Sequence, residues 1–141
     1  SSAELMAFVT AACGPLESAP SPTRSTPQRP EWLRERLTAV PAWLDRSPDD
    51  VFAETWTGAF ALESVPAAFY AFLRSPDDPR EVLRTAANAS HDTDTIASMA
   101  GNLAGAWLGA EEVEREIGEW WALLEDRGTV EAAGTRIAAL A

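Results

Sequence analysis

Apolar residues recur at steps of three and four along most of this chain, with polar or charged residues between them. Such spacing is typical of amphipathic α-helices, because it gathers the apolar side chains on one face. The pattern predicts helices over residues 3–13, 31–45, 48–56, 64–74, 79–88, 93–108, 111–126 and 129–140. Trp120 and Trp121 should lie on a buried helix face. No segment alternates like a β-strand, so we expect an all-α domain of about seven helices.

Prolines and glycines indicate where these helices should begin and end. Five prolines in residues 14–30 predict an irregular loop, and Pro41, which lacks a backbone donor, should end or kink its helix. A capping side chain before a proline predicts a helix start at Ser47 and at Asp78, where Glu81 would complete a capping box. Two glycines are the predicted C-terminal stops: Gly109 and Gly128.

The excess of acidic over basic residues limits the kinds of partner that the chain can bind. The chain has 22 acidic and 11 basic residues and a net charge of −11, without a basic stripe, which argues against a nucleic-acid surface. No apolar run reaches the roughly 18 residues of a membrane span, and no signal peptide is recognisable. We therefore expect a cytoplasmic protein without a membrane partner. A single cysteine and a single histidine exclude a zinc site and a Cys–His nucleophile.

The most specific chemistry lies at residues 92–95, where Asp-Thr-Asp-Thr gives four consecutive oxygen-bearing side chains. They stand at the mouth of a predicted helix in which Gly101, Gly105 and Gly109 would allow close packing. Carboxylate and hydroxyl oxygens are ligands for Mg²⁺ and Ca²⁺, and an acidic pair at a buried helix mouth is costly without a cation or hydrogen bonds. Asp and Thr are also good N-caps, so the run alone leaves both a metal site and an elaborate cap open.

Two segments carry a resemblance to a known family. Residues 57–73 read Thr-Gly-Ala-Phe-Ala-Leu-Glu-Ser-Val-Pro-Ala-Ala-Phe-Tyr-Ala-Phe-Leu, and residues 86–109 contain the Asp-Thr-Asp-Thr run and an Ala/Gly-rich helix. In order and spacing they resemble the C-terminal half of the ADP-ribosylglycohydrolases, which include the dinitrogenase reductase-activating glycohydrolases. The family signature is Gly-Gly-Asp-Thr-Asp-Thr, and Ser90-His91 replaces its Gly-Gly here. Serine and histidine have less backbone freedom than the two glycines, and the histidine adds an imidazole to the loop.

The resemblance implies an orthogonal helical bundle that holds two Mg²⁺ ions, with Mn²⁺ as an alternative, and that hydrolyses the glycosidic bond between ADP-ribose and a protein side chain or small acceptor. By the same resemblance, the metal ligands are Asp92, Asp94 and Thr95. The substrate contacts would come from four residues: Gly58, Phe60, Ser90 and His91. Phe60 would lie against the adenine or be an ordinary core residue. His91 would contact a phosphate or the leaving group, or only hydrogen-bond its own loop.

The resemblance covers only the C-terminal half of the family's domain, so we expect residues 1–141 to be part of one such domain. The family's Thr-Asp-Asp metal segment has no counterpart here, and the catalytic acid/base group would lie in the missing N-terminal half. We therefore expect an incomplete enzyme that acts on an ADP-ribosylated substrate together with a complementary N-terminal half. The alternatives are a catalytically inactive ADP-ribose-binding or regulatory module, and a purely structural helical bundle.

Overall fold

The computed structural model describes residues 2–13 and 31–140 of the chain. These residues form eight α-helices and no strand, which confirms the predicted all-α fold. The helices are α1 (Ser2–Cys13), α2 (Glu31–Trp43), α3 (Pro48–Thr55), α4 (Ala61–Arg74), α5 (Pro79–Ala87), α6 (Thr93–Leu108), α7 (Ala110–Trp121) and α8 (Arg127–Ala138). The predicted proline-rich loop, residues 14–30, lies outside the described residues. No helix in the described ranges is long and apolar enough to cross a membrane.

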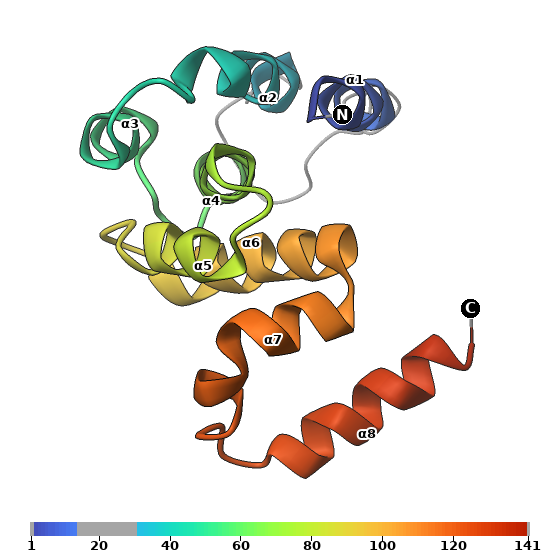
Figure 1. Ribbon diagram of the computed structural model, residues 1–141. Helices are drawn as coiled ribbons and strands as arrows, with labels where there is room; N and C mark the ends of the chain where they lie inside the picture. The colour runs from blue at the N-terminus through green and yellow to red at the C-terminus, as the bar shows by residue number, and fades with distance from the viewer. Residues whose placement is uncertain (1, 14–30, 141) are drawn as a thin grey trace.

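Helix α4 is the centre of the fold. Nine of its 14 residues are buried. Helix α2 packs against one side of α4, and α5 and α6 pack against the other (Figure 1). Tyr70 and Phe72 are fully buried, and the ring of Phe52 from α3 meets Tyr70 edge-on with 5.6 Å between centroids. Burying an aromatic side chain of this size contributes on the order of 2 kcal/mol, so α4 fixes the helices that carry the candidate site.

Both predicted proline-linked helix starts are confirmed. The Ser47 hydroxyl accepts a hydrogen bond from the Asp50 N–H at 3.2 Å and begins α3. The Asp78 carboxylate accepts one from the Glu81 N–H at 3.0 Å and begins α5. In both helices a proline occupies the first position, where its missing N–H costs nothing.

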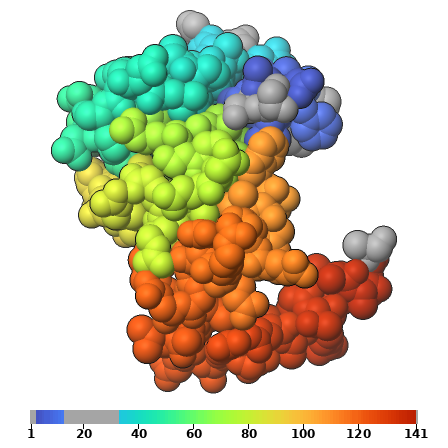
Figure 2. All heavy atoms as spheres, in the orientation of Figure 1, coloured from blue at the N-terminus to red at the C-terminus, as the bar shows by residue number. Residues whose placement is uncertain are grey.

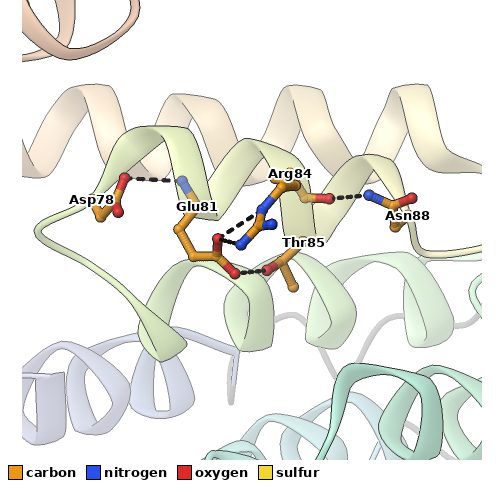
Figure 3. Close-up of polar contacts among 5 residues, drawn as sticks. All are labelled: Asp78, Glu81, Arg84, Thr85 and Asn88. Carbon is orange, nitrogen blue, oxygen red and sulfur yellow. Dashed lines mark hydrogen bonds and ion pairs between the residues drawn. The ribbon is translucent and has the colours of Figure 1, made fainter.

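Only one of the two hydrogen bonds of the predicted capping box on α5 forms, the one from the Glu81 N–H to the Asp78 carboxylate. The Glu81 carboxylate accepts hydrogen bonds from Arg84 Nε at 2.8 Å and Thr85 Oγ1 at 3.2 Å and does not return to the backbone of Asp78 (Figure 3). The Asp78 N–H instead donates to the Ser75 carbonyl, at 3.0 Å. One turn further on, the Asn88 side-chain amide donates to the Arg84 carbonyl at 2.7 Å. These polar contacts run along α5 to its C-terminal end, where the loop to α6 begins.

The helix end predicted at Gly128 is wrong, whereas α2 ends within two residues of Pro41, close to the prediction. Pro41 does not end α2 at once, because the helix continues to Trp43 and the proline falls in its last turn. Gly128 lies inside α8, and α7 already ends at Trp121. Turn hydrogen bonds after Trp121 and a left-handed φ of 56° at Asp126 separate these two helices without a glycine.

The glycines of α6 differ in their surroundings. A Cβ atom at Gly101 would lie 3.1 Å from the Leu83 side chain of α5, so this glycine allows the close approach predicted for it. No heavy atom lies within 4 Å of such a Cβ at Gly105. Gly109 is confirmed as a stop, since its φ is 83° and its N–H donates to the Gly105 carbonyl at 2.9 Å. Of these three glycines, only Gly101 therefore lies against a neighbouring helix.

Helices α7 and α8 extend away from the core, as Figures 1 and 2 show. Neither helix contains a buried residue, so the prediction of a buried tryptophan face is wrong for the part of the chain described. Trp120 is exposed and lies under the Arg80 guanidinium at 4.6 Å. Trp121 is half-buried and lines, with Val113 and Ile117, an apolar cavity of about 260 Å³ that Glu131 of α8 also borders.

Candidate functional site

Two loops that are far apart in the sequence meet at the start of α6. The α3–α4 loop contributes Thr57, which is fully buried. The Thr57 carbonyl accepts a hydrogen bond from the Asp92 N–H at 2.8 Å. Its hydroxyl donates to the Ala89 carbonyl and accepts from the His91 N–H at 3.4 Å. Thr57 therefore binds the α5–α6 loop at three points and joins the two segments that carry the family resemblance.

Ser90 has a backbone conformation that favours glycine. Its φ is 85°, in the left-handed region, although the residue carries a Cβ atom. Ser90 therefore has a conformation that a glycine, the residue of the family signature at this place, would adopt without strain. The chain accepts the strain because Thr57 holds the loop on both sides of Ser90, at Ala89 and at His91.

Asp92 occupies the N-cap position of α6 without capping the helix. Its side chain accepts no hydrogen bond from the first turn, in contrast to the side chains of Ser47 and Asp78 on α3 and α5. Its φ of −95° and ψ of 58° lie outside the extended conformation that these two caps adopt. Helix capping alone does not explain this carboxyl group.

The Asp92 carboxyl instead contacts Asp94. Its hydrogen bond to Asp94 is the largest reason that the pKa of Asp94 lies below its usual value. Hydrogen bonds from the backbone N–H groups of Thr95 and of Asp94 itself lower this pKa further. Asp94 and Thr95 are both exposed on the first turn of α6. The structure thus brings two of the predicted metal ligands into contact and leaves the third beside them, open to a ligand.

The number of ligands in this group is small. Within the described ranges, no group of three or more His, Cys, Asp and Glu side chains could hold a metal ion. Asp92 and Asp94 supply two carboxylates, and Thr95 can add a hydroxyl oxygen. Mg²⁺ usually takes six oxygen ligands, some of them water and substrate. The described residues therefore provide part of a coordination shell.

The predicted substrate residues Gly58 and Phe60 lie on the α3–α4 loop. A Cβ atom at Gly58 would lie only 2.5 Å from Glu63 Oε2, so the Glu63 carboxylate rests against this glycine. Phe60 is the N-cap residue of α4 and is half-buried. Its two interpretations, an aromatic contact for adenine and an ordinary core residue, both stay predictions.

Sequence reasoning missed two residues of this site. In the sequence, Thr57 is only the first residue of a segment that resembles the family, and Glu63 is another residue of that segment without a predicted role. Thr57 acts through contacts with residues 32 and 34 positions away, which no local pattern reveals. Glu63 is in the first turn of α4, where the favourable interaction of an acidic side chain with the helix dipole already explains its presence.

Comparison with known proteins gives a match over the whole chain. The sequence profile of the family described as ADP-ribosylglycohydrolase matches residues 1–141. The chain is similar to ADP-ribosylhydrolase ARH3 of Mus musculus at 40% identity, of Gallus gallus at 41% and of Homo sapiens at 36%. Each alignment covers 91 residues, which is 55% of this chain and 25% of the relative. The chain thus spans about a quarter of the length of these curated relatives. No solved structure gives a significant match.

Proposed function

The chain belongs to the ADP-ribosylglycohydrolase family, and from this premise we propose that it takes part in Mg²⁺-dependent hydrolysis of an ADP-ribosyl glycosidic bond. In this proposal, Asp92, Asp94 and Thr95 at the start of α6 are metal ligands. The two loops joined by Thr57 form part of the ADP-ribose pocket. The substrate is an ADP-ribosylated protein side chain or small acceptor.

The placement of Asp92 and Asp94 at the start of α6, where the Thr57 carbonyl holds the Asp92 N–H at 2.8 Å, carries this proposal. Two carboxyl groups in contact repel each other when both are ionised, so they need a shared proton or a cation. Asp92 forms no cap hydrogen bond that would otherwise explain its place. A divalent ion beside the pair would offset the repulsion, and the positive end of the α6 dipole alone is a weaker compensation.

The chemistry of these donors fits a hard cation. Carboxylate and hydroxyl oxygens suit Mg²⁺ and also Mn²⁺. Such an ion, when bound, would supply Lewis-acid chemistry, orienting the ribose hydroxyls and activating water for attack at the anomeric carbon. The chain's own part is to hold the carboxylates in place, which Thr57 does through the Asp92 N–H.

The substrate side of the proposed site consists of four residues: Gly58, Phe60, Ser90 and His91. The half-buried ring of Phe60 offers a face on which adenine can stack. At Gly58 there is no room for a Cβ atom, because the Glu63 carboxylate already lies against the glycine. Ser90 and His91 immediately precede Asp92 on the α5–α6 loop, which Thr57 binds at Ala89, His91 and Asp92.

We further propose that a complementary helical segment completes the site. It would supply the remaining metal ligands and the acid/base group. Large apolar side chains are exposed in the turn after α7, on α8 and just after α8: Leu123, Ile137 and Leu140, at 84%, 70% and 88% of their surface. Exposed apolar groups of this kind are typical of a surface that another protein element covers.

The test is release of ADP-ribose from substrates with arginine, serine, nucleic-acid base and small-metabolite linkages, measured with the chain and its complementary segment. We expect release from one of these linkages in Mg²⁺ or Mn²⁺ and none after EDTA treatment. Activity that survives EDTA would contradict the metal role. Binding of ADP-ribose without any hydrolysis would favour the inactive binding or regulatory module, and no binding at all would favour a structural bundle.

A further inference from the structure

The hydrogen bonds of Thr57 determine which nitrogen of His91 carries a proton. A threonine hydroxyl has one hydrogen to donate and two lone pairs to accept with. The Thr57 hydroxyl donates its hydrogen to the Ala89 carbonyl, which can only accept. It therefore acts as an acceptor toward its other two neighbours, the His91 N–H and His91 Nδ1, each 3.4 Å away. His91 Nδ1 must then carry a hydrogen.

In the neutral form of the ring, this tautomer leaves a lone pair on His91 Nε2. In a neutral imidazole one nitrogen donates and the other accepts. The ring is exposed, and among the described residues Thr57 is its only hydrogen-bond partner. Nε2 is thus an unused acceptor on the residue that immediately precedes Asp92.

We propose that His91 Nε2 accepts a hydrogen bond from a hydroxyl of the distal ribose, the sugar whose glycosidic bond is cleaved. This inference rests on the proposed function and adds a role for one residue within it. A lone pair excludes the pyrophosphate as the partner, because phosphate oxygens at neutral pH carry no hydrogen to donate. A ribose hydroxyl keeps its hydrogen when its oxygen faces a cation, so an acceptor beside the carboxylates is complementary to it.

Isothermal titration calorimetry with two ligands tests this role in the assembled protein in Mg²⁺. ADP-ribose contains the distal ribose, and ADP lacks it but keeps the adenine and both phosphates. His91→Asn retains a donor toward Thr57 and loses the distant acceptor, whereas His91→Gln extends an amide oxygen towards the position of Nε2. We expect His91→Asn to weaken ADP-ribose binding about fivefold to tenfold, the worth of one hydrogen bond. ADP binding should not change, and His91→Gln should restore most of the affinity.

Several outcomes would overturn this role. Equal ADP-ribose affinity in wild type and both variants, with hydrolysis intact in the wild type, removes the role of His91 and leaves the proposed function standing. A parallel loss of ADP binding would place His91 at the adenosine or phosphate part, and unchanged binding with slowed turnover would place it at the leaving group. If the wild type itself binds no ADP-ribose and hydrolyses nothing, the proposed function fails together with this inference.

Discussion

Ser90 holds a backbone angle that a glycine would adopt without strain. Replacing Ser90 by glycine should therefore stabilise the fold by up to about 1 kcal/mol. The change relieves backbone strain in the folded state, and the greater chain entropy of glycine in the unfolded state offsets part of this gain. Urea denaturation measures the difference. The matched control is Ser98→Gly, at an exposed position inside α6, which should cost about 0.5 kcal/mol. Equal destabilisation by both changes would show that the loop stores no strain at Ser90.

Tyr70, the only tyrosine, gives the fold a dependence on alkaline pH. Its hydroxyl donates to the Arg46 carbonyl at 2.9 Å, and burial raises its pKa above the usual 10.0, opposed by the nearby Arg74 charge. Because the folded state favours the neutral phenol, the stability it contributes is complete below pH 10 and is lost as pH rises through the folded pKa. Tyr70→Phe should remove this loss and cost about 1 kcal/mol at neutral pH.

Absorbance at alkaline pH, which reports the single phenol, and urea denaturation from pH 8 to 12 measure the two parts of that prediction. A wild type and a Tyr70→Phe variant that lose stability in parallel above pH 10 would contradict it.

At this scale the sequence identified residues better than it identified their contacts. Asp92 and Asp94 were recognised from a local run of oxygen-bearing side chains, and the structure brings their carboxyl groups together. Their role as metal ligands stays a prediction. The contribution of Thr57 could not be read from the sequence, because it depends on a fold that brings two loops more than 30 residues apart into hydrogen-bonding distance.

Two aspartates at helix starts differ in what they do for their helices. The Asp78 side chain accepts the Glu81 N–H and begins α5, whereas the Asp92 side chain forms no cap hydrogen bond with α6. We expect Asp78→Ala to lower the free energy of unfolding by about 1 kcal/mol and Asp92→Ala to leave it nearly unchanged without metal. Thermal melts of both variants in EDTA make the comparison. If Asp92→Ala lowered the stability more than Asp78→Ala does, Asp92 would be a helix cap and this prediction would be wrong.

Helix starts were predictable where the chemistry is local, whereas of the two predicted glycine stops Gly109 is confirmed and Gly128 is wrong. Ser47 and Asp78 carry their capping groups beside a proline, so both starts could be placed from the sequence. Gly128 was assigned as a stop because glycine often ends helices, but α7 ends earlier through a series of turn hydrogen bonds. Such turns depend on the chain's competing hydrogen bonds more than on residue type.

At the scale of the whole molecule, α7 and α8 predict association. Their exposed apolar residues should drive the chain to bind a complementary helical segment or to self-associate when that segment is absent. Light scattering across a concentration series should show oligomers, and the double variant Ile137→Ser with Leu140→Ser should reduce them while keeping the helical circular dichroism. A wild type that stays monomeric at every concentration would contradict this prediction.

The spacing of apolar residues predicts the all-α class, which the structure confirms. Two short segments indicate the family, which the profile match confirms. The long-range placement of α7 and α8 was beyond sequence reasoning. The tryptophan face of α7 was expected to be buried, but no residue of α7 is buried and Trp120 is exposed.

Divalent-metal affinity of Asp94→Ala tests the central claim most directly. In the assembled protein, wild type and the control Glu111→Gln, an exposed acid in the first turn of α7, should bind Mg²⁺ alike. Asp94→Ala should lose about 100-fold or more in Mg²⁺ affinity together with hydrolysis, because one carboxylate of the proposed site is gone. Its helical circular dichroism should remain. Unchanged Mg²⁺ affinity and activity, with only the loss of about 1 kcal/mol expected of a cap, would contradict the account.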